Sequence, residues 1–143
     1  MIKQAEITDI NAAAELAALL YGPPIEKHKE ELTALLVSNR ARIFLKYENG
    51  MPIGFAQCQL RGDYVEGTSS SPVGYLEGIF VRERYRHKGY ARELLSACEQ
   101  WAKEIGCTEF ASDCELTNTD SLLFHKAMRF TEANRIICFT KKL

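Results

Sequence analysis

The stretch that most constrains the fold runs from Tyr75 to Leu94 and reads YLEGIFVRERYRHKGYAREL. It begins as an apolar run typical of a strand, passes through a short basic segment and enters a helix at Gly89. The first turn of a helix has backbone N–H groups without internal partners, and the helix dipole adds positive charge there. A glycine at this point lets the backbone approach an anion closely. The stretch therefore predicts a strand, a basic loop and a helix start that together bind a phosphorylated ligand.

The remaining segments predict further strands and helices on both sides of this stretch. In chain order, the expected elements are a strand (2–7), a helix ending by Tyr21-Gly22-Pro23-Pro24, a helix (25–38), strands (42–47, 52–61 and 73–81), the helix that starts at Gly89 and ends at Gly106, a strand (107–112), a short helix capped by Asn118 or Thr117 and running through Met128, and a last strand (131–142). Glu48-Asn49-Gly50 is typical of a hairpin turn. No internal repeat or low-complexity segment interrupts this order, so the sequence predicts one α/β domain over residues 1–143.

The composition excludes several classes of protein. The formal net charge of -1 gives no overall basic field, so a nucleic acid is not an expected partner. No apolar run approaches the ~20 residues that a membrane span needs, and the amino terminus lacks a signal-peptide pattern, which favours a cytoplasmic protein without a membrane partner. The five cysteines include no C-x-x-C pair and are accompanied by only three histidines. We therefore expect reduced thiols that pack as small apolar groups, and no metal site.

Arg86, Gly89 and Ala91 form the pattern R-x-x-G-x-A, which lies between the predicted strand and a strongly amphipathic helix. Two other phosphate-binding patterns, G-x-x-x-x-G-K-[ST] and G-x-G-x-x-G, do not occur in the chain. With Val81 five residues before it, the pattern resembles the acetyl-coenzyme A signature of the GNAT N-acetyltransferase family. The order of elements is also similar to that of the family. The resemblance implies a single-domain fold in which a mixed central β-sheet is flanked by about four helices.

The resemblance also implies acetyl-CoA as a cosubstrate and assigns residues to its parts. In the family, backbone N–H groups of the loop hold the pyrophosphate, while the preceding strand binds the pantetheine arm and polarises the thioester carbonyl. Carried over to this chain, the pyrophosphate contacts are His87, Lys88, Gly89, Tyr90, Ala91 and Arg92. The pantetheine contacts are Ile79, Phe80 and Val81, and Asn118 would contact the coenzyme from the last helix.

A narrower resemblance, to the aminoglycoside 6'-N-acetyltransferases, covers most of residues 60–142. It rests on Y-L-E-G-I-F-V (75–81), W-A-K (101–103), C-T-E-F-A-S-D (107–113), Y-V-E-G-T (64–68) and the S-P at 71–72. It implies antibiotic resistance, a homodimer and a polycationic antibiotic as the amine substrate, with a pocket lined by Tyr21, Tyr64, Glu77 and Asp113. Glu26, on the charged face of the helix expected over 25–38 and near the turn at Tyr21, could also meet a ligand.

The two carboxylates make physical sense in such a site, because a polycation requires negative charge aimed into a cleft. Glu77 interrupts an apolar strand immediately before Gly78, which predicts a β-bulge that opens the strand toward a ligand. Asp113 ends the neighbouring strand, so the two carboxylates are expected to converge. The alternatives are an edge-facing glutamate, a capping aspartate and a Tyr64 that only packs its loop.

The predicted reaction is direct attack of a neutral primary amine on acetyl-CoA in a ternary complex. Glu77 is the candidate general base, acting directly or through water, because a protonated amine has no lone pair. His125 is the candidate acid for the coenzyme thiolate, since it occupies a position at which many family members carry a tyrosine. A histidine that only packs at the surface is the alternative, and Tyr90, the other nearby hydroxyl, is expected to pack.

Three positions depart from the pattern of the related resistance enzymes: Arg129 in place of glycine, Asn134 in place of an acidic residue and Tyr21 in place of tryptophan. These departures leave open the drug range, the natural substrate and the way the helix ends near His125. Two other functions remain as alternatives. One is an acetyltransferase for another small amine or a protein amine, and the other is a coenzyme A-binding regulatory module without turnover.

Overall fold

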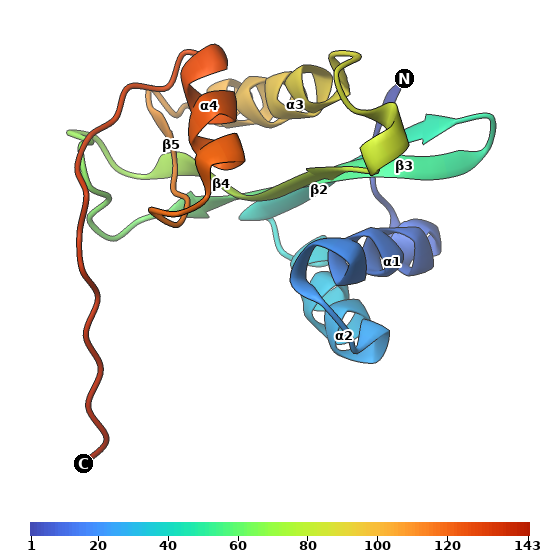
Figure 1. Ribbon diagram of the computed structural model, residues 1–143, viewed down its shortest axis with the longest axis horizontal. Coiled ribbons are helices and arrows are strands. Elements are labelled where there is room, and N and C mark those ends of the chain that lie inside the picture. Colours follow the sequence, from blue (N-terminus) through green and yellow to red (C-terminus); the bar gives the residue numbers. More distant parts are fainter.

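A five-stranded sheet forms the centre of the computed structural model, which describes all 143 residues (Figure 1). Its strands lie in the order β1-β2-β3-β4-β5, and each pairs antiparallel with the next except β4 and β5, which are parallel. The strands are β1 (Ile2–Gln4), β2 (Ala41–Glu48), β3 (Met51–Arg61), β4 (Val73–Val81) and β5 (Phe110–Ser112). The mixed sheet expected from the sequence is confirmed.

Four α-helices cover the two faces of this sheet. They are α1 (Ile10–Tyr21), α2 (Ile25–Leu36), α3 (Tyr90–Glu104) and α4 (Thr119–Ala127), and two short 3-10 turns, η1 (Ile7–Asp9) and η2 (Glu83–Tyr85), connect the elements. Figure 1 shows α1 and α2 below the sheet and α3 and α4 above it. No helix is both long and apolar enough to cross a lipid bilayer.

Each face of the sheet has its own apolar core. On one face, Leu94, Leu95 and Trp101 of α3 pack against side chains of β2, β3 and β4. On the other face, Leu16 of α1 and Leu32 of α2 pack against β2 and β3. The thiols of Cys58 and Cys98 are fully buried within the first core, as their apolar sequence context predicts.

A one-residue bulge interrupts the pairing of β3 with β4. Gln57 lies opposite Gly78 while Cys58 lies opposite Leu76, so Glu77 is the extra residue. Pairing of β4 with β5 covers only Gly74 to Leu76, so beyond Leu76 the outer edge of β4 has no neighbouring strand. The bulge predicted beside Gly78 is therefore present, at the point where β4 and β5 separate.

Most predicted boundaries agree with the structure to within a few residues, and two do not. The strand expected over 107–112 is only three residues long, because the Cys107 N–H is donated to the Ala102 carbonyl at the end of α3. The first strand ends at Gln4; the Ala5 N–H still donates to the Ile43 carbonyl at 2.8 Å, and Glu6 then caps η1.

The prediction of a last strand over residues 131–142 is wrong for the isolated chain. Residues 131–143, which we call the C-terminal arm, contain no strand and extend away from the body (Figure 1). Ile136, Ile137 and Phe139 give the arm the composition of a strand, but all three are exposed. A strand needs a partner for its backbone groups, and the arm finds none within this chain.

The buried face of α3 provides a test of the packing. Leu94 is completely buried, so Leu94→Ala is expected to lower the free energy of unfolding by about 2–5 kcal/mol through lost apolar contacts and the cavity left behind. Leu116→Ala is the matched control, because Leu116 is 73% exposed and its truncation is expected to cost under about 0.5 kcal/mol. Urea denaturation followed by circular dichroism measures both variants, and equal losses would contradict this packing.

Candidate active site

The loop between β4 and α3 presents backbone donors at a helix start. Gly89 caps α3 with φ of 84°, a left-handed conformation that disfavours side chains, and His87 also has a positive φ of 62°. No atom lies within 4 Å of the position that a Gly89 Cβ would occupy, so the approach to the backbone is open. The first turn of α3 therefore offers free N–H groups to an anion, as the sequence predicts.

Basic side chains gather beside this loop. An open groove of about 660 Å³ is lined by Leu19, Phe80, Arg82, Glu83, Arg84 and Arg86. Arg86 donates from Nε to the Val81 carbonyl at 2.8 Å, which fixes the loop against the end of β4. His87, Lys88 and Arg92 are exposed, as a surface that meets a phosphorylated ligand requires. The groove reaches Phe80 of β4. Phe80 lies with Ile79 and Val81 on the part of β4 whose outer edge has no neighbouring strand.

A charge pair between the buried Lys46 and the exposed Glu93 links the start of α3 to the sheet. Lys46 of β2 contacts Glu93 at 2.9 Å and lies 4.6 Å above the Tyr90 ring. The pKa of Lys46 is raised by hydrogen bonds to the N-terminal amine and to Glu93. Tyr90 donates its hydroxyl to Glu48 at 3.0 Å, so it packs as expected rather than facing the groove with a free hydroxyl. Ala91 is half-buried behind it.

Glu77 lies at the bulge and is held by Arg61, a residue that the sequence analysis missed. Arg61 donates from Nε to Oε2 at 3.0 Å and from Nη2 to Oε1 at 2.6 Å, a bidentate ion pair. Hydrogen bonds to Glu77 raise the pKa of Arg61, which therefore stays cationic. The two residues are 16 positions apart, and the only sequence signal is a basic residue at the end of the strand that pairs with the Glu77 strand.

Tyr75 connects this ion pair to Asp113. The Arg61 guanidinium carbon lies 3.5 Å from the centre of the Tyr75 ring, and the Tyr75 hydroxyl donates to Asp113 Oδ2. Burial and the hydrogen bond to Asp113 raise the pKa of Tyr75, so its hydroxyl remains a donor. The predicted convergence of Glu77 and Asp113 therefore takes place through Arg61 and Tyr75 rather than by direct contact.

Tyr21 meets the bulge from the end of α1. Its hydroxyl donates to the Glu77 carbonyl oxygen at 3.2 Å. A Cβ at Gly78 would lie 2.0 Å from the same hydroxyl oxygen, so only glycine fits at position 78 with Tyr21 in place. Tyr21 is half-exposed and thus forms one wall beside Glu77, where its side chain can also meet a ligand.

Two predicted substrate residues lie apart from this cluster. Tyr64 is 78% exposed, and its hydroxyl contacts Glu66 at 3.4 Å within the same loop. Glu66 also accepts a hydrogen bond from Asn134 at 3.0 Å, so the base of the C-terminal arm lies against this loop. Glu26 lies in the first turn of α2, and its exposed carboxylate lies 3.7 Å from Lys29. Neither Tyr64 nor Glu26 contacts Glu77 or Asp113.

His125 lies between α4 and β5 in a half-buried position. Its Nδ1 is 2.7 Å from the Ser121 carbonyl oxygen and its Nε2 is 2.7 Å from Ser112 Oγ, while Phe130 packs 5.1 Å from its ring. Asn118 caps α4 by accepting the Ser121 N–H at 3.1 Å. Arg129 has φ of 70°, the backbone conformation for which glycine is favoured, so the helix ends here as it would with glycine.

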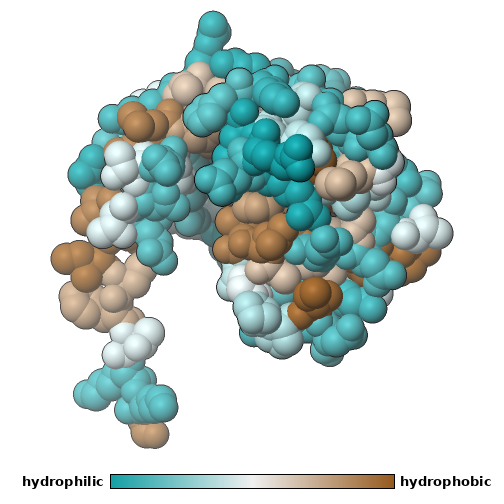
Figure 2. Space-filling view, turned by 45° about the vertical axis from the view of Figure 1, so that its right-hand side comes forward, coloured by the Kyte–Doolittle hydropathy of each residue, from teal (hydrophilic) through white to brown (hydrophobic).

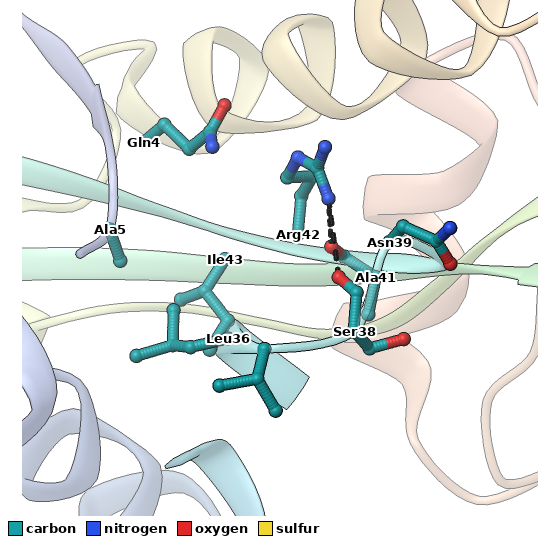
Figure 3. A pocket seen from close by; sticks show the side chains of 9 residues that line it. Gln4, Ala5, Leu36, Ser38, Asn39, Ala41, Arg42 and Ile43 are labelled. Carbon is teal, nitrogen blue, oxygen red and sulfur yellow. Dashed lines mark hydrogen bonds between the residues drawn. The ribbon is translucent and has the colours of Figure 1, made fainter. Parts of the chain in front are cut away.

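Another hollow, of about 280 Å³, lies at the other end of the sheet (Figure 3). Figure 3 shows Arg42 and Gln4 on the α3 side of the sheet and Leu36 and Ile43 on the opposite side. Arg42 is held internally, since it donates to the Ala41 carbonyl at 2.7 Å and to the Ser38 carbonyl at 3.4 Å. No predicted site residue lines this hollow, and no group of three or more acidic, histidine or cysteine side chains in the chain could hold a metal ion.

Comparison with known proteins assigns this arrangement to a family. Residues 10–130 match the model of the acetyltransferase (GNAT) family. The chain belongs to this family and is an acetyltransferase, which confirms the resemblance seen in the sequence.

Within this family, the chain is similar to a narrower group of enzymes. The chain is 37% identical to an aminoglycoside N(6')-acetyltransferase type 1 of Acinetobacter haemolyticus, over 99% of this chain and 98% of the relative. It is 40% identical to a protein of the same name from Serratia marcescens, over 82% of each chain.

Solved structures give the same grouping. The aminoglycoside antibiotic 6'-N-acetyltransferase AAC(6')-IG of Acinetobacter haemolyticus superposes with a TM-score of 0.95 at 36% identity, covering 100% of this chain and 99% of that one. AAC(6')-Iy in complex with the bisubstrate analogue CoA-S-monomethyl-acetylneamine gives a TM-score of 0.95 at 36% identity, covering 100% and 98%.

Proposed function

We propose that this chain is an aminoglycoside 6'-N-acetyltransferase, which moves the acetyl group of acetyl-CoA to a primary amine of the antibiotic and thereby gives resistance. The observation that carries the proposal is the placement of the Glu77 and Asp113 carboxylates beside the unpaired edge of β4. A polycation needs such carboxylates, and the free strand edge beside them suits an extended coenzyme arm. The named relatives span nearly the whole chain and support the same substrate class.

Acetyl-CoA fits the groove beside the β4–α3 loop. Its pyrophosphate would meet the backbone N–H groups at residues 87–92, where Gly89 leaves open space. Its pantetheine arm would follow Ile79–Val81, because β4 has no strand neighbour on that side. Asn118, at the start of α4, would contact the coenzyme from the opposite wall.

In the proposed reaction the amine nitrogen attacks the thioester carbonyl, a C–N bond forms, and the C–S bond then breaks to release the coenzyme thiolate. Glu77 would accept the amine proton, directly or through a water molecule. His125 would return a proton to the thiolate through the Ser112 hydroxyl that its Nε2 contacts. Tyr21 would wall the amine beside Glu77, and Tyr64 and Glu26 would contact outer parts of the antibiotic.

A second candidate, an acetyltransferase for a less charged amine on the same scaffold, is favoured by one observation. Arg61 already offsets the charge of Glu77, so the cleft has less negative charge than its carboxylates alone suggest. A monoamine would need fewer acidic contacts than an aminoglycoside does. The two candidates differ in which amine releases coenzyme A.

We also propose a homodimer formed through the C-terminal arm. Ile136, Ile137 and Phe139 are 71%, 80% and 87% exposed, and Figure 2 shows apolar side chains along the part of the arm that stands off the body. β5 is the last strand of the sheet and has a free edge. A second copy of the chain could therefore give each arm a strand to pair with. We further propose that residues 1–143 act as one acetyltransferase domain in the cytoplasm, since all five cysteines are free thiols.

The proposed activity predicts thiol release that depends on the drug. Acetyl-CoA incubated with the protein and tobramycin or kanamycin should release free coenzyme A, detected with a thiol reagent, and neither compound alone should suffice. Glu77→Gln should lower kcat/KM for the drug by about 10²-fold, as expected for loss of a general base. Glu104→Gln, at the far end of α3, is the matched control. Release with another amine but with no aminoglycoside would favour the second candidate, and unchanged kinetics of Glu77→Gln would exclude its catalytic role.

The proposed dimer predicts a mass in solution of twice the chain mass, measured by sedimentation equilibrium. Ile137→Asp should shift the population toward monomer, because a charge would be buried where the arm meets the second copy. Val37→Asp is the control, since Val37 is 83% exposed at the end of α2 and is not part of the arm. A wild-type protein that is monomeric at all concentrations would contradict the dimer.

A further inference from the structure

We infer that Arg61 is a positioning residue of the amine site, which fixes the Glu77 carboxylate toward the substrate and lets it share the cleft with Asp113. This inference rests on the proposed function and adds a residue to it. Arg61 lies at the end of β3, opposite Val73 in the sheet register, and reaches along β4 to the bulge. No role for it follows from the sequence patterns.

The bidentate contact determines how Glu77 is presented. Nε and Nη2 each bind a different carboxylate oxygen, at 3.0 and 2.6 Å, so the carboxylate is fixed in position and in plane. Each oxygen of a carboxylate has two lone pairs, and Arg61 uses one on each. The remaining lone pairs stay free for an ammonium or hydroxyl group of the substrate. A glutamate without this contact would sample several rotamers and lose entropy on binding.

Tyr75 holds Arg61 in turn. The residue is buried, with 5% exposure, and its ring supports the guanidinium at 3.5 Å. A planar guanidinium stacks on an aromatic face in a way that an ammonium does not. Since the Tyr75 hydroxyl also binds Asp113, one buried side chain orients both carboxylates.

Arg61 has a second role, which is to balance the negative charge of the two carboxylates. Glu77 binds Arg61, which stacks on the Tyr75 ring, and Asp113 accepts the Tyr75 hydroxyl, so a cation beside this cluster reduces the repulsion between the two carboxylates. Arg61 offsets one negative charge, and the exposed Asp113 keeps its own for the substrate. The Tyr21 hydroxyl donates to the Glu77 backbone carbonyl, so Glu77 is held at its backbone by Tyr21 and at its carboxylate by Arg61.

The opposite role is a competing cation, in which Arg61 occupies the place of the substrate ammonium and must leave before binding. The two roles predict opposite changes in drug binding when Arg61 is removed. If Arg61 positions Glu77, its removal weakens drug binding. If it competes with the drug, its removal strengthens binding.

Steady-state kinetics of Arg61→Met, alone and combined with Glu77→Gln, test the inference. Arg61→Met should raise KM for tobramycin about tenfold or more while KM for acetyl-CoA stays within about twofold, because only the amine site loses an oriented group. Arg61→Lys should recover part of the loss, since it restores the charge but not the bidentate contact. In the Glu77→Gln background, Arg61→Met should raise KM for tobramycin by less than about twofold, because Arg61 acts through Glu77.

The outcomes separate this inference from the proposed function. A wild-type protein without drug-dependent release would overturn both. If the wild type is active on the drug but Arg61→Met leaves KM for tobramycin unchanged or lowers it, the positioning role alone is overturned. The same holds if Arg61→Met raises this KM equally in the wild-type and Glu77→Gln backgrounds. Arg61→Lys and Tyr75→Phe, which keeps the stacked ring, serve as second variants if Arg61→Met does not fold, and circular dichroism checks the fold of each. Wild-type KM in Arg61→Lys, which lacks the bidentate contact, would likewise overturn the inference.

Discussion

The one-residue bulge at Glu77 is the constraint on which the site depends. Because side chains alternate along a strand, one extra residue in β4 reverses the alternation beyond that point and bends the strand. It coincides with the end of pairing between β4 and β5, so the rest of β4 keeps a free edge. The same local departure from regular pairing thus provides a carboxylate on one side and backbone groups for an extended ligand on the other. Gly78 lets the Tyr21 hydroxyl approach the bulge, because a Cβ at this position would lie 2.0 Å from that hydroxyl.

The charges along β4 divide the site into two ends. At its carboxyl end, arginines and the start of α3 provide positive charge for a phosphorylated donor. At the bulge, Glu77 and Asp113 provide negative charge for a cationic acceptor, and Arg61 and Tyr75 hold them in position. In the proposed complex, donor and acceptor would meet near Ile79, between the bulge and the carboxyl end of β4. Such a division would let a chain with almost no net charge bind both of the oppositely charged substrates proposed for it.

Sequence patterns predicted the parts of the fold that depend on local chemistry. The strand, basic loop and helix start from Tyr75 to Leu94 follow from residues that are neighbours in the chain, and the glutamate before Gly78 was enough to predict the bulge. The contact between Arg61 and Glu77 was not predictable, because sheet register brings the two together and no spacing rule records it. The strand predicted over the C-terminal arm is absent for a different reason. Its composition is that of a strand, but no strand of this chain pairs with it, and composition alone does not say where a partner lies.

A crystal structure of the protein with coenzyme A and tobramycin would test the central claim, that one strand binds both substrates, most directly. The account predicts the pantetheine arm along Ile79–Val81, the pyrophosphate at the backbone of residues 87–92, and an amine of the drug within hydrogen-bond distance of Glu77, whose ion pair with Arg61 is retained. A drug amine bound away from β4, or a pantetheine arm that does not follow this edge, would contradict it.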